Sequence, residues 1–377
     1  MKVAIARKTM LHEWRRFLPA IVAVGFSGVL MIVQGALLLG VVGSNALYVT
    51  RSQADLWVGF PGTLSVDLGR AINSSVAADL YLQPQVARVE PFLLGTGDWR
   101  GARGGGTSVT IVGIDPRLEG LALAATIPLK MRVLLQEPGT VLVDKADLDK
   151  LETDVGRMAE INGRLVRVVG AVAGLRSMGG VNAICSINSA RGLDASLGSS
   201  DDVTYYLVTA TNPRLTRVLR QQLTKNGTVR RFDVWTSDEL ASKSVRYWLM
   251  ESGAGVGFLF ATAIAILVGT LVTSQTLMAA VAASMTQYAT LRALGVPFKA
   301  LKQIVIEQAG WVGLCGLLIG AAFSLATAVV ARAGGVPFEL SFSIISIASL
   351  VVVAVALAAG LLALRRLQHV DPATLLR

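Results

Sequence analysis

The chain has 377 residues, of which 53% are hydrophobic and only 16% charged, and its mean hydropathy is +0.58. This composition is too apolar for an ordinary soluble protein and indicates a membrane protein. The net charge of +10 does not indicate a nucleic-acid partner, because the basic residues flank apolar runs and no stacking aromatics accompany them on one surface.

Four apolar runs are long enough to cross about 30 Å of hydrocarbon, which takes about 20 helical residues. They comprise residues 17–43, 253–283, 309–331 and 340–364. With four spans, the segments before the first, between the second and third, and after the last all face one side. Eleven Lys and Arg residues lie in these three segments. The positive-inside rule therefore places both termini in the cytosol.

The domain boundaries follow from these runs. We expect a cytosolic basic N-terminus (1–16), a first transmembrane helix (17–47), a large extracytoplasmic domain (48–246), a second helix (247–284), a cytosolic coupling helix and loop (285–302), a third helix (303–331), a short external loop (332–339), a fourth helix (340–364) and a cytosolic tail (365–377).

The first span could be mistaken for a signal peptide, since Ser44-Asn45-Ala46 offers small residues for cleavage. Its apolar run of about 27 residues is well beyond the 7–15 of a signal sequence. It is therefore predicted to be an uncleaved anchor. Gly25 and Gly28 in this span would permit close contact with another helix.

The domain between the first two spans has a mixed α and β pattern. Strands are expected over residues 55–59, 86–94, 107–114, 140–143 and 203–210, a hairpin over 158–172 with its turn at Asn162-Gly163, and helices over 74–82, 144–151 and 213–225. In the last helix, Leu215, Val218, Leu219 and Leu223 are expected on one buried face. The order predicts a βαβ-like subdomain from the two ends and a β-rich insertion between them.

No catalytic, cofactor or metal site is predicted in this chain. The only histidines, His12 and His369, lie near the cytosolic termini, so a histidine base is missing outside. The acidic residues between 144 and 154 lack the glycine pattern of a calcium loop and are read as a solvated helix face. Cys185 and Cys315 fall in different compartments, which excludes an intrachain disulfide. The domain is interpreted as a binding and transmission element.

Inside the third span, Gly316 and Gly320 form a GxxxG pattern that favours tight packing against another helix. Glu307, near the inner end of this span, shares a helix face with Gln303 and is a candidate for helix packing or coupling. None of the four runs has a charged residue at its centre. Secondary transport, which normally needs one, is therefore disfavoured.

The polar interval between the second and third spans has a helix–stop–restart pattern. Tyr288, Leu291 and Leu294 lie at helical spacing, Gly295 suits a left-handed helix end, and Pro297 suits the first turn of the next helix. The sequence therefore predicts a rigid knuckle on the cytosolic side.

This interval carries a family resemblance. The sequence TLRALGVP (290–297), followed by Glu307, resembles the signature of FtsX/MacB-type permeases, which are membrane subunits of ABC systems. The C-terminal HVDPATLLR, with Asp371 and Pro372, resembles the same family's tail. The N-terminal RRFLPAIVAVGFSGVLMIVQGALLLG is most similar to the DevC-like branch.

The resemblance implies a type VII ABC (MacB-like) architecture: a membrane protein with four transmembrane helices and a large α+β extracytoplasmic domain between helices 1 and 2. It also implies a bacterial inner-membrane location, a homodimer and a separate ABC ATPase that holds ATP and Mg, since this chain has no Walker A motif. The ATPase would dock on Tyr288, Leu291, Arg292, Leu294, Gly295 and Pro297, and the tail would contact a cytosolic partner through Asp371 and Pro372.

Two functional alternatives remain open besides an exporter of a lipid, glycolipid or other amphiphile that works with a periplasmic adaptor and an outer-membrane channel. One is an FtsX-like regulator of a cell-wall hydrolase. The other is a membrane-anchored receptor without an ATPase. Contacts with membrane lipid are expected in every case.

Overall fold

The computed structural model describes residues 12, 14–101, 104–177, 180–198, 201–225, 231–284, 287, 290–291, 294–334, 336, 338 and 340–368. The chain forms two compact units, which are treated separately below. One, the span unit, comprises residues 1–40 and 257–377; the other, the sheet domain, comprises residues 41–256.

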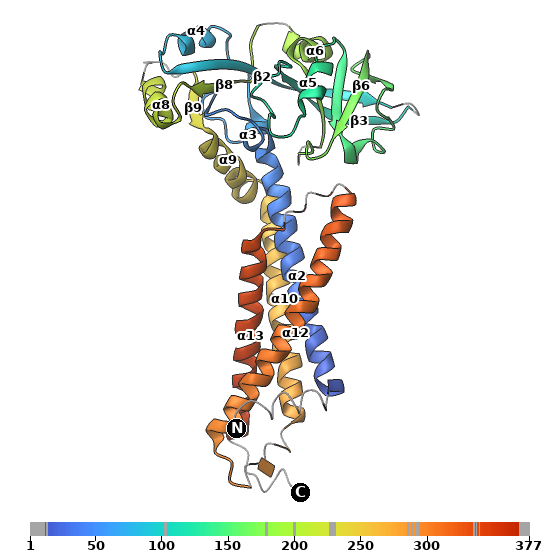
Figure 1. The fold of residues 1–377 in the computed structure, drawn as a ribbon, viewed down its shortest axis with the longest axis vertical. Helices are drawn as coiled ribbons and strands as arrows, with labels where there is room; N and C mark the ends of the chain where they lie inside the picture. Colours follow the sequence, from blue (N-terminus) through green and yellow to red (C-terminus); the bar gives the residue numbers. More distant parts are fainter. Residues whose placement is uncertain are drawn as a thin grey trace. The chain divides into compact units, whose positions relative to one another are not determined.

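The span unit is built from four long helices, all long and apolar enough to cross a membrane (Figure 1). They are α2 (Trp14–Gly43), α10 (Gly253–Ala283), α12 (Phe298–Ala333) and α13 (Phe342–Gln368). The 36 residues of α12 correspond to about 54 Å, well beyond the hydrocarbon thickness. This helix begins inside the segment expected as a cytosolic loop up to residue 302, because residues 298–308 contain no Gly or Pro to stop it.

One half of the sheet domain is a four-stranded antiparallel sheet with two interleaved βαβ units. Its strands are β1 (Leu56–Gly59), the first half of β2 (Val86–Arg100), β8 (Tyr205–Ala210) and β9 (Asp233–Thr236), in the order β9-β1-β8-β2. Helix α4 (Val76–Tyr81) connects β1 to β2, and α8 (Thr216–Lys225), preceded by the 3₁₀ turn η4 (Pro213–Leu215), connects β8 to β9. This is the split βαβ arrangement of ferredoxin-like folds, and it agrees with the βαβ-like subdomain expected from the two ends.

The other half is a closed ring of six strands. The second half of β2 pairs with β3 (Gly106–Ile114), and the ring continues through β7 (Val181–Ser186), β4 (Thr140–Asp144), β6 (Arg164–Val172) and β5 (Met158–Ile161). Strand β5 returns to the end of β2 at Trp99 and Arg100. Closure leaves no unpaired sheet edge. The turn between β5 and β6 has positive φ at both Asn162 (49°) and Gly163 (78°), as a two-residue type I′ hairpin requires.

Short helices complete the domain. They are η1 (Ser44–Ala46), α3 (Leu47–Thr50), η2 (Val66–Leu68), α5 (Leu129–Leu134), η3 (Lys145–Asp147), α6 (Ile187–Leu193), α7 (Ala195–Gly198), α9 (Ser237–Arg246) and the π-helical turn η5 (Tyr247–Glu251). The predicted helix over 144–151 is wrong: only η3 forms there. The Asp144 side chain accepts the N–H groups of Ala146 and Leu175, and Glu152 has a positive φ of 50°, so the backbone turns instead.

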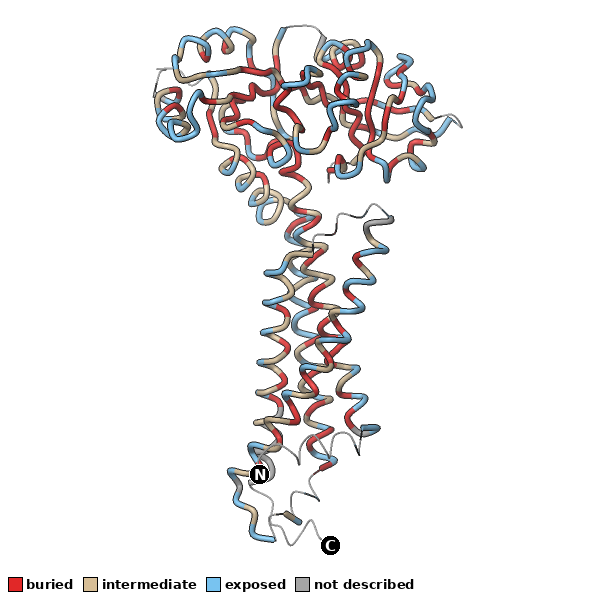
Figure 2. Tube along the Cα trace, viewed as in Figure 1, coloured by how far each residue is buried: buried red, intermediate tan, exposed pale blue. Residues whose placement is uncertain are grey.

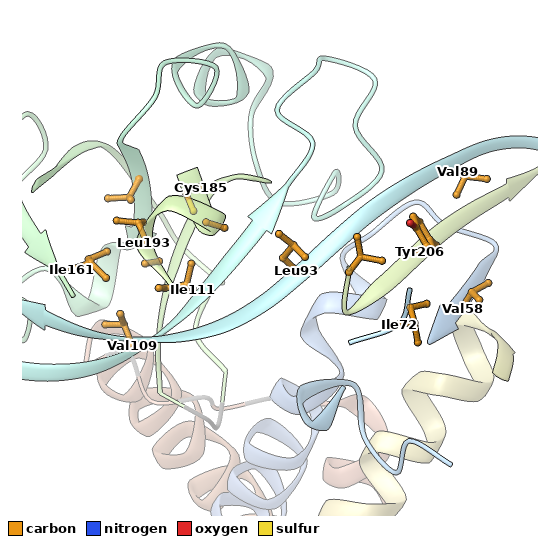
Figure 3. Packing of buried hydrophobic residues seen from close by; sticks show 14 of the residues in the cluster. Val58, Ile72, Val89, Leu93, Val109, Ile111, Ile161, Cys185, Leu193 and Tyr206 are labelled. Carbon is orange, nitrogen blue, oxygen red and sulfur yellow. The ribbon is translucent and has the colours of Figure 1, made fainter. Parts of the chain in front are cut away.

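Alternating side chains of the split βαβ sheet build two hydrophobic clusters. Leu56 and Val58 point to the face covered by α4 and α8, and Trp57 between them points to the other face. The first cluster continues into the interior of the six-stranded ring, where Ile111 and Ile161 pack (Figure 3). Figure 2 shows burial along the tube, and β1, β4 and β7 are the strands buried at every residue.

The second cluster lies on the face covered by α3 and α9. The Trp57 ring contacts the rings of Phe92 and Tyr205 edge-on, with both centroid distances 5.5 Å. Tyr48 from α3 and Leu240 from α9 join the same cluster. These two helices lead directly to the first and second spans, so the segments that join the membrane helices share one face of the sheet.

Candidate functional site

The segment between α10 and α12, residues 284–297, is the candidate site and is called the connecting segment below. Its end, Leu294 to Pro297, is described together with Thr290 and Leu291. The predicted docking residues Tyr288 and Arg292 lie outside the described residues, as do Asp371 and Pro372 of the tail.

Gly295 ends the connecting segment's helix in a left-handed conformation, with φ of +88°. The N–H of Leu294 donates to the carbonyl of Thr290 over 3.0 Å, and the N–H of Val296 donates to the carbonyl of Leu291 over 3.1 Å. The second bond reaches back five residues, which is the long hydrogen bond of a Schellman motif around a C′ glycine.

The Schellman turn is packed against the ends of both spans. Leu291 and Val296 pack on a cluster formed by Val281 of α10 and by Leu301 and Val305 of α12. A contact between the residues at these two positions is the usual hydrophobic partner of the motif. The turn and the two helix ends therefore form one compact unit.

The described residues that were predicted to dock the ATPase differ in exposure. Leu291 is half-buried and points to the spans, whereas the Leu294 side chain is 77% exposed. Gly295 and Pro297 are exposed beside it. An exposed tip of Leu294, Gly295 and Pro297 therefore remains for a partner, while Leu291 belongs to the packing beneath it.

Pro297 immediately precedes α12. Its carbonyl accepts the N–H groups of Ala300 and Leu301, at 2.9 and 3.4 Å. Proline has no N–H to leave unsatisfied at a helix start, and its fixed φ suits the first turn. The restart expected from the sequence is thus the point where the long helix begins.

Glu307 lies nearly three helical turns after Pro297 on α12 and is half-buried. Its neighbour Gln308 is only 3% exposed. The structure therefore places the carboxylate at the boundary between the packed and the exposed sides of the helix.

Gly316 and Gly320 of α12 lie against the first span. A Cβ on Gly316 would stand 2.6 Å from Cγ1 of Val24, and one on Gly320 would stand 3.1 Å from the carbonyl oxygen of Gly25. The GxxxG pattern of one helix thus meets the Gly25 region of the other, and the backbones approach at a distance that side chains would prevent.

In the described part of the chain, no three His, Cys, Asp or Glu residues gather in a group that could hold a metal ion. Cys185 is fully buried, and burial raises the pKa of its thiol to about 12. A thiol so rarely ionised is a poor nucleophile and metal ligand.

A buried acidic group in the sheet domain was not anticipated. Glu90 of β2 is fully buried, and its two oxygens accept the N–H groups of Leu121 and Ala122, at 2.7 and 3.1 Å. Arg88 approaches Glu90 to 3.5 Å and Asp115 to 3.2 Å. Burial raises the pKa of Glu90. The only sequence signal was the pair of charges Arg88 and Glu90 within the predicted strand 86–94.

Residues 259–372 match the family model described as FtsX-like permease C-terminal. This match spans α12, α13, the connecting segment and most of α10. A comparison with curated protein sequences gives no match.

Two solved structures resemble about half of the chain. The periplasmic region of MacB from Actinobacillus actinomycetemcomitans is 14% identical, with 52% of this chain and 94% of that one covered and a TM-score of 0.37. The extracellular domain of YknZ, a noncanonic ABC-type transporter from Gram-positive bacteria, is 15% identical, with 48% and 99% covered and a TM-score of 0.32.

The family match includes the TLRALGVP motif that carried the resemblance in the sequence. A mixed α and β domain lies between the first two of four candidate spans. Over residues 259–372 the chain therefore matches the FtsX-like permease family.

Proposed function

We propose that this permease works with a separate ABC ATPase and passes ATP-driven motion from the connecting segment through the spans to the sheet domain. ATP and Mg would be held by the partner chain. The observation that supports this most directly is the exposed Leu294 at the tip of a rigid turn between two spans.

A rigid turn suits the transfer of force. The hydrogen bond between Val296 and Leu291 fixes its backbone, and the shared cluster with Val281 and Leu301 fixes its position on both helix ends. A push on Leu294 therefore moves α10 and α12 rather than bending a loop. Burial of Leu294 in a protein partner would remove its exposed apolar surface from water.

The composition of the spans also favours transmission over a substrate path through their centre. No Asp, Glu, Lys or Arg occurs in residues 252–283, 308–331 or 340–364. The hydroxyls of Thr262, Thr276 and Thr327 donate to carbonyls of their own helices, four residues earlier. The donor of each of these three hydroxyls is satisfied within one helix, so they do not themselves indicate a polar path.

We further propose that the chain acts as a homodimer in a bacterial inner membrane, with both termini in the cytosol and the sheet domain outside. The DevC-like first span favours a tripartite exporter with a periplasmic adaptor and an outer-membrane channel. Its cargo would be a lipid, a glycolipid or another amphiphile.

The two alternatives predict different partners. A regulator of a cell-wall hydrolase would bind the ATPase and a hydrolase but would move no cargo. A receptor would bind no ATPase. Purification of the native complex separates all three, because it reports the ATPase, the adaptor and the hydrolase together.

The ATPase partnership is tested by recovering the ATPase with tagged permease, with membrane insertion checked in parallel. Leu294→Asp should reduce recovery about tenfold, because it places a charge in an apolar contact. Leu165→Asp is the matched control, since Leu165 is 70% exposed in the sheet domain. Equal recovery with both variants would show that the ATPase does not use this tip.

Two charged residues that the sequence singled out are tested as well, Arg292 by recovery of the ATPase and Glu307 by coupled ATP turnover. Arg292→Lys keeps the charge but loses the five-donor fork, so weaker recovery would assign Arg292 to the contact rather than to topology. Glu307→Gln should lower coupled ATP turnover. Unchanged assembly and turnover would remove Glu307 from the coupling path.

A further inference from the structure

Basic residues are concentrated in one part of the sheet domain. Residues 213–231 contain six Lys and Arg and no Asp or Glu, whereas residues 48–246 as a whole carry 23 basic and 20 acidic residues. This stretch includes η4 and α8. A single-sign cluster in a nearly neutral domain attracts partners of opposite charge.

Helix α8 uses fewer apolar residues for the core than its sequence suggested. Leu219 and Leu223 are buried in the first cluster, at 0% and 5% exposure. Leu215 and Val218, expected on the same buried face, are 37% and 46% exposed. Leu215 falls in the 3₁₀ turn before the helix, and Val218 lies about 100° around the helix from Leu219.

Two of the arginines are engaged within the domain. Arg220 pairs with Glu239 of α9 and also donates to the carbonyl of Val234. Arg231 pairs with Asp79 of α4 at 2.6 Å. These two charges therefore fix α8 and its following strand in place.

Arg214 and Arg217 are different. Both are exposed, and among the described residues neither has a carboxylate within 4.0 Å. They flank the exposed Leu215 and Val218, and Gln221 continues the same face one turn on. The α8 face, defined as Arg214, Leu215, Arg217, Val218 and Gln221, thus combines two unpaired guanidinium groups with two apolar side chains.

We propose that the α8 face docks an acidic, amphipathic segment of another extracytoplasmic protein. Arginine beside partly buried aliphatic groups is typical of protein contacts, and its fork matches carboxylates. Carboxylates of the segment would bind Arg214 and Arg217, and its apolar residues would cover Leu215 and Val218.

A second copy of the chain fits less well as the occupant. A second copy bound through the same face would bring arginines against arginines, because a twofold contact uses one patch twice. A protein segment of complementary charge remains.

The inference rests on the proposed function only in that the sheet domain lies outside the cytosol. Its test uses full-length permease in native cells, with a photo-crosslinking residue at Gln221. The control position is Lys130, which is exposed on α5. The expected result is a crosslink from 221 but not 130 to one protein, mapped to a peptide rich in Asp or Glu.

Charge reversal completes the test. Arg214→Glu with Arg217→Glu should lower the crosslink yield about tenfold, and Lys substitutions at the mapped acidic residues should restore it. Arg164→Glu reverses one charge at an exposed position on the hairpin and should leave the yield unchanged.

Three results would overturn the proposal: a crosslink no stronger than at Lys130, a crosslink to lipid or to a second copy, or a yield that survives the charge reversal. Recovery of the ATPase in the same cells is measured separately. If no ATPase is recovered but the crosslink forms, only the proposed function is refuted. If the ATPase is recovered but the crosslink is absent, only the α8 contact is refuted.

Discussion

The N–H of Val296 donates to the carbonyl of Leu291 over 3.1 Å, and the side chains of the same two residues pack on one cluster with the ends of α10 and α12. Both the backbone hydrogen bond and the apolar contact require Gly295, the residue before Val296, to hold a positive φ. The turn thus depends on one glycine.

Gly295→Val should weaken ATPase recovery while leaving membrane insertion intact. A residue with a Cβ is destabilised by about 1–2 kcal/mol in this conformation. The cost is conformational and not a clash, because a Cβ at Gly295 would meet no atom within 4 Å. Gly310→Val is the matched control, because its Cβ also meets open space and Gly310 lies within helix α12. Equal ATPase recovery from both variants would contradict the role of the positive φ.

Reporter fusions test the predicted topology. Fusions near residues 100, 200 and 335 should report an outside location, and fusions at 290 and 377 a cytosolic one. The reason is the placement of eleven cations on one side of four apolar runs. A cytosolic signal at residue 200 would refute the four-span arrangement.

Gly316→Ala should destabilise the span unit by about 1–3 kcal/mol, the usual cost of overfilling a packed contact. The added Cβ would lie 2.6 Å from Cγ1 of Val24 and 3.1 Å from the backbone nitrogen of Gly25. Gly310→Ala, in open space on the same helix, should be neutral or stabilising. Thermal unfolding in detergent compares the two variants. Equal melting temperatures would show that the α2–α12 contact accommodates the added methyl group without loss of stability.

Local signals predicted much of the fold. Gly295 and the Asn162-Gly163 turn were found because positive φ is a property of one or two residues. Strands β1, β2 and β8 of the split βαβ sheet were found because clear turns separate them, whereas β9 was missed. Strand β7 was missed because the polar residues Asn182 and Ser186 interrupt its apolar run, although all six of its residues are buried.

Distant contacts explain what could not be predicted. The inward direction of Leu291 depends on Val281 and Leu301, which lie about ten residues away on either side. The exposure of Val218 depends on where α8 meets the sheet. The ring closure between β5 and β2 depends on a pairing across sixty residues, Trp99 with Ile161.

Glu90 gives the sheet domain a pH-dependent stability. Its carboxyl group is fully buried, and burial raises its pKa in the folded state above the ordinary value of about 4.3. The folded state therefore binds the proton more tightly than the unfolded state. The free energy of unfolding should fall as pH rises from the ordinary pKa to the raised one, by about 1.4 kcal/mol for each pH unit between the two, and should not fall further above the raised pKa.

Glu90→Gln should remove this component. The amide cannot accept both N–H groups of Leu121 and Ala122, so the variant carries a constant penalty at every pH. The difference in melting temperature between variant and parent should nevertheless shift in the variant's favour as pH rises from about 4 through the titration of the buried carboxyl. Glu160→Gln, at a more exposed site on β5, is the control and should show a much smaller shift. Melting curves of full-length permease that stay parallel for Glu90→Gln across this range would show that the buried carboxyl does not titrate in the folded protein.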